Sequence, residues 1–139
     1  MRHGVTLIEI AVVLVIIGVL CALGVPPLLR FIERAQVRHA TNEIVATLAR
    51  ARATAVGLSA HVTVHVDPAR SVLAVTSGGD TLFVRHLAAV YGVTVQSNRD
   101  STVYGPTGLG HGAANQTVVI RRGASYDSVI ISRLGRVRR

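Results

Sequence analysis

A single carboxylate, Glu9, lies at the edge of a long uncharged segment and constrains what this chain can become. The twenty residues from Ile10 to Leu29 carry no charge, and Arg30 is the next charged residue. As a helix with a rise of ~1.5 Å per residue, they can span the ~30 Å hydrocarbon core of a membrane. Insertion scales put a central acid in such a helix at a cost of roughly 2.5 to 3.5 kcal/mol. We therefore expect Glu9 to have a cationic partner, and the best candidate is the amine that cleavage after Gly4 creates at Val5.

The N-terminal sequence around this acid forms a specific motif. The basic leader Met1-Arg2-His3-Gly4 is followed by Val5-Thr6-Leu7-Ile8-Glu9 and then by the apolar segment. This combination closely resembles the processing and assembly signature of type IV pilins and pseudopilins, with Val5 standing where phenylalanine is commonest. The resemblance implies that a prepilin peptidase cuts between Gly4 and Val5 and methylates the new amine. It also implies that Glu9 pairs with the amine of a neighbouring subunit in a filament.

Three other interpretations of the apolar segment compete with this one. A secretory signal peptide could be cut after Ala22-Leu23-Gly24, but ordinary signal peptides avoid an acid such as Glu9 early in the apolar core. A lipoprotein would be acylated at Cys21, yet Leu20 occupies a position that should hold a small residue. A plain membrane anchor explains the length of the segment and leaves the acid without a purpose.

The chain is basic and contains no lysine. Its 139 residues include fifteen cations, all of them arginine, against seven acids, which gives a formal net charge of +8. The absence of lysine excludes a Walker lysine, a Schiff-base lysine and a lysine general base, and the planar arginine forks suit phosphate or carboxylate. The single cysteine, Cys21, leaves no possibility of a disulfide within the chain. About a hundred residues remain after the anchor, enough for one modest core.

Hydrophobic periodicity predicts one long helix from Val5 to about Val56. Two adjacent prolines, Pro26 and Pro27, predict a kink or a locally unwound stretch near residues 22 to 27. The second half is amphipathic, and its apolar residues recur at steps of three and four. They are Val37, Ala40, Ile44, Leu48, Ala51 and Ala55.

After Gly57 the period changes to two, which predicts strands. The valines of His61–Val66 mark the buried face of a strand, and a turn at residues 67–70 leads to a return strand over 71–76. Further strands are expected at 81–87, 93–95, 103–104, 117–121 and 126–132, with a glycine-rich loop over 105–116. One long helix followed only by strands predicts an α+β fold, with antiparallel sheet packed on the C-terminal half of the helix.

The order of hairpin, glycine-rich loop, late strand and terminal Gly135-Arg136-Val137-Arg138 resembles the FimT/GspH family of minor pilins and pseudopilins. The resemblance implies the pilin fold, with a leader at 1–4, a transmembrane or filament-core helix at 5–29, an amphipathic helix half at 30–57 and a β-rich globular domain at 58–139. It implies a single-pass protein of the bacterial inner membrane whose C-terminal domain lies outside the cytoplasm before it joins a filament. Family members serve in type IV pili or in the type II secretion pseudopilus, and in FimT-like members the terminal segment is implicated in binding DNA during uptake for natural transformation.

The basic C-terminus is the second informative feature. If residues 136–139 form a strand, Arg136 and Arg138 point to one side ~6.6 Å apart, close to the ~7 Å spacing of phosphates along one DNA strand. We also expect Arg121 and Arg122 to lie on a neighbouring strand. The alternative is a solvated tail, in a structural pseudopilin of type II secretion with no nucleic-acid role. The candidate DNA-binding residues are thus Arg121, Arg122, Arg133, Arg136, Arg138 and Arg139.

The sequence predicts neither an enzyme nor a cofactor site. His61 and His65 share a strand face but lie ~13 Å apart, too far to chelate one metal ion. The glycines of the 105–112 segment lack the Gly-Lys-Ser/Thr of a phosphate loop, and neither a nucleophile elbow nor paired carboxylates are found. We expect no metal, no cofactor and no small-molecule substrate. The expected partners are prepilin peptidase, other pilins, the inner membrane and, in the first of the two functions, double-stranded DNA.

Overall fold

The structure is a computed structural model that describes residues 6–112 and 115–139. The predicted processing residues, Gly4 and Val5, lie outside the described residues. The chain divides into two compact units, of which the first ends at Ile32 and the second comprises Glu33–Arg139.

The first unit is the apolar part of α1, a helix that extends over Leu7–Leu58. At its N-terminus the amide of Glu9 donates to Thr6 Oγ1 (3.3 Å) and the amide of Thr6 donates to Glu9 Oε2 (3.4 Å), the reciprocal arrangement of a capping box. The backbone stays helical through Pro26 and Pro27, so of the two predicted alternatives, a kink or an unwound stretch, the unwound stretch is not found. Each proline removes only one amide donor, and the remaining hydrogen bonds hold the helix. By length and composition this segment can cross a membrane.

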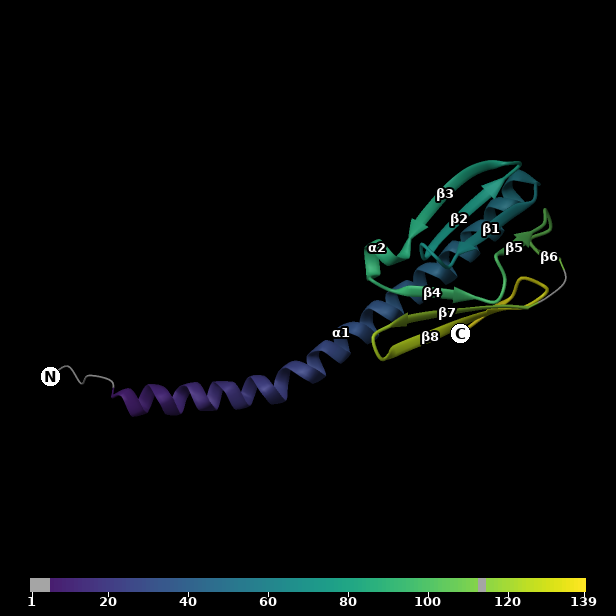
Figure 1. Cartoon of the computed structure of the whole chain (residues 1–139). Helices are drawn as coiled ribbons and strands as arrows, with labels where there is room; N and C mark the ends of the chain where they lie inside the picture. The colour runs from purple at the N-terminus through teal and green to yellow at the C-terminus, as the bar shows by residue number, and fades with distance from the viewer. Residues whose placement is uncertain (1–5, 113–114) are drawn as a thin grey trace. The chain divides into compact units, whose positions relative to one another are not determined.

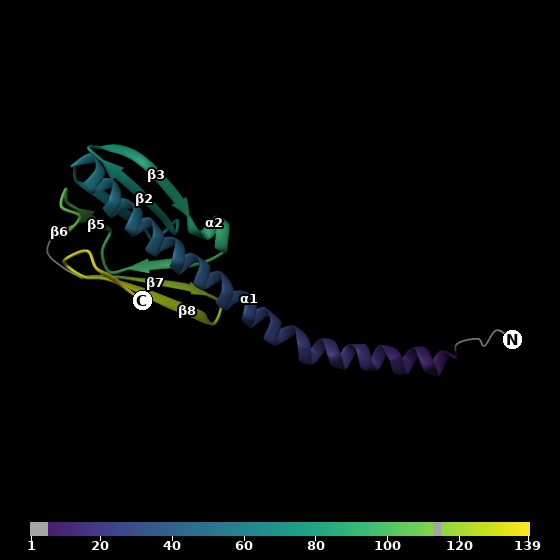
Figure 2. The same ribbon diagram turned by 180° about the vertical axis from the view of Figure 1, so that it is seen from behind.

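The second unit packs two antiparallel sheets against the second half of α1, which Figure 2 shows running across them. Their strand orders are β3-β2-β1-β5-β6 and β4-β7-β8-β9, and the short helix α2 joins β3 to β4 (Figure 1). The elements are β1 Val62–Asp67, β2 Val72–Ser77, β3 Asp80–His86, α2 Leu87–Tyr91, β4 Thr94–Ser97, β5 Ser101–Tyr104, β6 Gly110–His111, β7 Gln116–Arg122, β8 Ser125–Ile131 and β9 Val137–Arg138. The predicted α+β class is confirmed.

The predicted apolar stripe of α1 forms the centre of the core. All six of its residues are buried, and three of them, Ala40, Ala51 and Ala55, are completely inaccessible to solvent. Because alanine is small, the strands can lie close to the helix at these positions. The valines of β1 are buried as predicted, and residues of the second sheet belong to the same core. The core residues of these strands are Val62, Val64, Val66, Val118, Ile120, Val129 and Ile131.

The structure corrects three details of the predicted strands. The third strand ends at His86, and Leu87 starts the five-residue helix α2 as a buried core residue. A helix this short has too little periodicity to be recognised in sequence. The predicted 105–116 loop contains strand β6, which pairs with β5, and the strands form two sheets because β5 joins β1 whereas β4 joins β7.

Candidate nucleic-acid interface

The C-terminal arginine segment folds as a tight turn between β8 and β9. Ser132 organises this turn, because its carbonyl accepts from the Gly135 amide (2.8 Å) and its hydroxyl accepts from the Arg136 amide (3.1 Å). The Ser132 amide in turn donates to the Arg136 carbonyl (2.8 Å). Strand β9 comprises only Val137–Arg138, so the strand over 136–139 that the ~6.6 Å spacing of Arg136 and Arg138 assumes is formed only in its middle.

Two glycines allow this turn to lie directly on the glycine-rich loop. A Cβ atom at Gly110 would be 2.5 Å from the Arg133 carbonyl oxygen and 2.7 Å from the Gly135 amide nitrogen. Gly135 adopts a left-handed φ of +78°, and its Cβ would be 2.7 Å from Cε1 of Tyr104. Side chains at either position would push the turn away from the domain. The glycines thus fix where Arg133 and Arg136 are presented.

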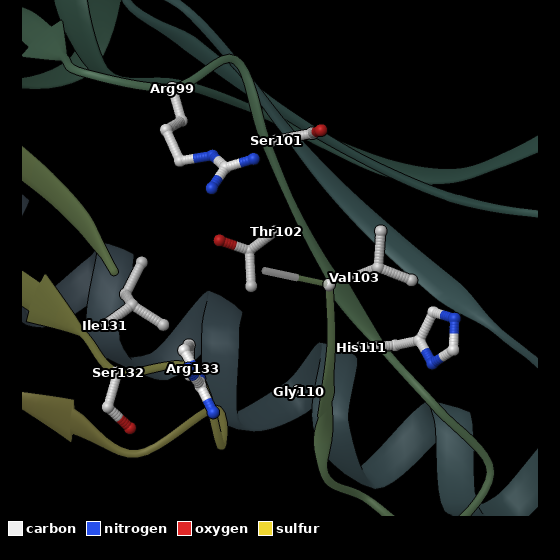
Figure 3. Close-up of a pocket in the computed structure, with 10 residues that line it drawn as sticks. Arg99, Ser101, Thr102, Val103, Gly110, His111, Ile131, Ser132 and Arg133 are labelled. Atoms are coloured by element: carbon white, nitrogen blue, oxygen red, sulfur yellow. The ribbon is translucent and has the colours of Figure 1, made fainter. Parts of the chain in front are cut away.

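The turn lies between two cavities, and each is lined by an arginine that the sequence analysis did not single out. One cavity, of about 180 Å³, has Arg99 from the β4–β5 loop on one side and Arg133 on the other (Figure 3). The other, of about 320 Å³, is lined by Arg52 of α1 and by Arg136. No spacing in the sequence relates Arg52 or Arg99 to the C-terminus, because only the tertiary fold brings them to the turn.

The backbone around the first cavity is fixed by side-chain hydrogen bonds. Gln116, only 2% exposed, donates from Nε2 to the Arg99 carbonyl (2.8 Å) and to Ser97 Oγ (2.9 Å). The Arg133 amide donates to Asn115 Oδ1 (3.1 Å). Both arginine side chains are nevertheless exposed. The arrangement therefore presents exposed guanidinium groups from a backbone that hydrogen bonds hold in place.

These four arginines carry uncompensated charge. Within the part of the chain that the structure describes, none of Arg52, Arg99, Arg133 and Arg136 forms an ion pair. The ion pairs found there involve other residues, namely Arg70 with Asp67, Arg85 with Glu43 and Arg139 with Asp127. Exposed guanidinium groups without acidic partners create a positive potential that attracts anions.

Comparison with known proteins decides the family. Residues 40–135 match the family described as Type II transport protein GspH, and residues 1–25 match the prokaryotic N-terminal methylation motif. The chain belongs to the GspH family. No curated protein matches it.

The fold of this GspH-family chain is similar to that of the type IV minor pilin FimU of Pseudomonas aeruginosa PAO1. A crystal structure of FimU in space group P21 aligns with a TM-score of 0.64 and 18% identity, covering 76% of this chain and 88% of FimU. A second crystal form of FimU, in space group P65, aligns with a TM-score of 0.59 and 17% identity, covering 73% of this chain and 90% of FimU. Family and fold are those of structural pilins. The methylation motif and the long apolar helix are those of a single-pass inner-membrane pilin whose domain lies outside the cytoplasm before it joins a pilus.

The six predicted DNA-binding arginines of this GspH-family chain do not form one group. Strand β8 lies between β7 and β9, so the prediction that Arg121 and Arg122 lie on a strand next to the C-terminal one is wrong. The register pairs Arg121 with Tyr126 at the β7–β8 turn, whereas Arg138 pairs with Ile130 farther along β8. Sequence spacing could not reveal this, because strand order depends on non-local pairing.

Two of the six side chains hold the fold together. Arg122 Nη1 donates to the carbonyl of Tyr91 at the end of α2. Arg139 binds Asp127 with Nε (2.8 Å) and Nη2 (2.7 Å), and its Nη1 donates to Asn42 Oδ1 of α1 (3.0 Å). The exposed members next to the turn are Arg133, Arg136 and Arg138.

The ring of Tyr104 packs against Gly135 of the turn. Its buried hydroxyl has no hydrogen-bond partner among the described residues. Burial raises the pKa of Tyr104 to about 12, and the positive charge of Arg52 partly opposes the rise. The folded state therefore holds this proton more tightly than the unfolded chain, in which the pKa of tyrosine is ~10. This difference in pKa contributes to the free energy of unfolding. The contribution is complete below pH 10 and is lost as the pH rises toward 12.

Replacing the tyrosine, Tyr104→Phe, is expected to preserve the fold and to raise the free energy of unfolding at pH 7 by up to about 1 kcal/mol, because a buried hydroxyl without a partner is removed. The variant should also lose less stability than wild type between pH 10 and pH 12. Urea unfolding at pH 7 and pH 11 measures both effects, with the exposed Tyr126→Phe as the control. A Tyr104→Phe variant less stable than wild type at pH 7 would mean that the hydroxyl has a stabilising partner.

Proposed function

We propose that this GspH-family chain is a minor pilin whose C-terminal turn binds the phosphate backbone of double-stranded DNA during uptake for natural transformation. In this proposal residues 1–4 are the leader, 5–29 the membrane and filament-core helix, 30–57 the amphipathic helix half and 58–139 the globular domain. Prepilin peptidase cuts between Gly4 and Val5. Glu9 then pairs with the amine of a neighbouring subunit in a type IV pilus-like filament.

The observation that carries the DNA-binding proposal is the cluster of unpaired, exposed arginines around the turn. Arg133 and Arg136 come from the turn itself, and Arg99 and Arg52 line the same two cavities. Guanidinium forks bind phosphate oxygens in a bidentate manner, and the anchored backbone limits the entropy lost on binding. Stacking on bases adds little here, because Tyr104 is buried and the ring of His111, which lines the first cavity, packs edge-on against His61 (ring centroids 5.0 Å). Binding is therefore independent of base sequence and sensitive to salt.

A second function is favoured by the family description, Type II transport protein GspH. In a structural pseudopilin of type II secretion, the same arginines contact acidic surfaces of partner subunits or of the exported protein. Attraction to acidic protein surfaces would explain the exposed arginines of the turn equally well. In that case DNA is not a ligand.

A gel-shift series with the fragment 33–139 and duplex DNA separates the two functions. We expect micromolar binding that weakens steeply with salt. In Arg133→Ala/Arg136→Ala, the affinity for DNA should fall at least about tenfold. The plot of the log association constant against log salt concentration should become less steep by roughly 1.8, or about 0.9 for each lost phosphate contact.

The matched control for this experiment is Arg34→Ala/Arg70→Ala, which removes the same charge elsewhere on the fragment. It should retain most of the affinity. Equal losses in both double variants would show that only net charge matters. Absence of a shift at low salt would remove the DNA-binding proposal and leave the pseudopilin function.

A further inference from the structure

Two exposed histidines from distant parts of the chain meet on the five-stranded sheet. His61 immediately precedes β1, and His111 is the last residue of β6. Their ring centroids are 5.0 Å apart, and the ring planes are inclined at 70°. Because β5 lies between β1 and β6 in the sheet, the two rings reach each other across β5.

A glycine at the end of β5 leaves the space that this meeting requires. A Cβ atom at Gly105 would be 3.9 Å from Nε2 of His61, so the ring of His61 lies beside this glycine. The Gly105 amide donates to the Leu109 carbonyl (2.8 Å), which holds the start of β6 in place. The register then sets His111 opposite Val103. The backbone on both sides of the histidine pair is therefore fixed by strand pairing.

The separation of the two rings suits ligation of one metal ion. Zinc binds an imidazole nitrogen at ~2.0 to 2.1 Å, and the ring centre lies ~1.1 Å behind that nitrogen, so two imidazoles on one tetrahedral ion have centroids ~5.2 Å apart. The observed 5.0 Å is close to this value. Both side chains are exposed, so their rings can turn their nitrogen atoms toward a shared ion without disturbing the core.

The surroundings of the pair limit how tightly it can hold an ion. Within residues 6–112 and 115–139, no group of three or more His, Cys, Asp or Glu side chains could hold a metal, so the protein supplies two ligands here and water fills the other positions. Arg99 and Arg133 line a cavity that His111 also lines, and their charges oppose a dication. Both guanidinium groups are exposed and therefore screened by solvent and salt, and in Figure 3 the ring of His111 points away from Arg99. We therefore expect micromolar affinity.

We propose that His61 and His111 together bind one divalent transition-metal ion such as Zn²⁺. Imidazole nitrogens favour Zn²⁺, Cu²⁺ and Ni²⁺ over Mg²⁺ and Ca²⁺. The bound ion joins the start of β1 to β6, whose other residue, Gly110, packs against the C-terminal turn. It therefore stabilises the glycine-rich loop on which the turn lies. The inference is independent of DNA binding, and no spacing in the sequence indicates it, because His61 and His111 become neighbours only through strand pairing.

Isothermal titration calorimetry of the untagged full-length chain in detergent micelles, with zinc chloride as the titrant, tests the proposal. We expect one ion bound per chain with a micromolar dissociation constant, and no binding of magnesium chloride. His61→Ala and His111→Ala should each weaken zinc binding by about 100-fold, because only one imidazole then remains. Each single variant should lose about as much affinity as the double variant His61→Ala/His111→Ala, since the two ligands act as a unit.

A matched control and a second measurement keep the outcome unambiguous. His65→Ala removes another exposed histidine of the same sheet, one that the register sets opposite Ala74 and Ser101, and it should bind zinc like wild type. In NMR spectra of the histidine side chains, zinc should shift the ring signals of His61 and His111 at the same metal concentration. The proposal is overturned if wild type binds no zinc, if either single variant keeps the wild-type affinity, or if His65→Ala loses as much. A zinc-dependent shift of only one of the two rings would equally rule out a shared ion.

Discussion

Replacing Glu9 with alanine is expected to leave membrane insertion intact and to reduce incorporation into filaments by a hundredfold or more. In the proposed filament, Glu9 neutralises the N-terminal amine of a neighbouring subunit among apolar helices. Removing one member of a buried charge pair leaves the other uncompensated, at a cost of roughly 3 to 5 kcal/mol. Immunoblots of sheared filaments and of the membrane fraction measure the ratio of assembled to membrane-inserted subunit. Wild-type amounts of Glu9→Ala in the filament fraction would contradict the pairing.

The helix cap provides a control that separates charge from local structure. Glu9 also receives the amide of Thr6, so its loss weakens the first turn of α1 as well. Glu9→Gln keeps an oxygen for this bond but has no charge, and we expect it to fail in assembly like alanine. Thr6→Ala removes the hydroxyl that accepts from the Glu9 amide but keeps the acid, and it should assemble. Rescue by glutamine would mean that Glu9 acts as a cap and not as a charge partner.

Gly110→Ala is expected to be the most destabilising single change in the globular unit among those considered. The new methyl group would collide with backbone atoms of Arg133 and Gly135, which cannot rotate away as a side chain can. Overpacking of this kind costs about 1 to 3 kcal/mol, and we expect the upper end of that range. For a domain of this size the melting temperature should fall by about 10 to 20 °C. Thermal unfolding of the fragment 33–139, followed by circular dichroism, measures the shift.

The same loop offers a matched control for this substitution. A Cβ atom at Gly105 would meet Leu109 O at 3.7 Å and His61 Nε2 at 3.9 Å, which are ordinary contacts. Gly105→Ala should therefore change the free energy of unfolding by less than about 0.5 kcal/mol. Gly110→Ala should also weaken DNA binding, because it displaces the turn that carries Arg133 and Arg136. Similar free energies of unfolding for the two variants would show that the turn does not pack directly against Gly110.

Features that depend on local periodicity could be predicted from the sequence. The apolar stripe of α1 and the buried valines of β1 follow directly from the order of residues, because a helix repeats every 3.6 residues and a strand every two. The same holds for the membrane-length segment and for the position of Glu9 at its edge. The class of the chain was therefore evident before its structure, and the family match supports it.

Features that depend on non-local pairing were decided only by the tertiary structure. Six arginines close together near the C-terminus predicted one basic surface, but β8 separates Arg121 and Arg122 from the last strand, and Asp127 and Asn42 hold Arg139. The turn instead gains Arg52 from α1 and Arg99 from the β4–β5 loop as neighbours. The physical reason is that residue patterns specify which face of each element is buried, whereas strand order and close glycine packing determine which exposed charges become neighbours.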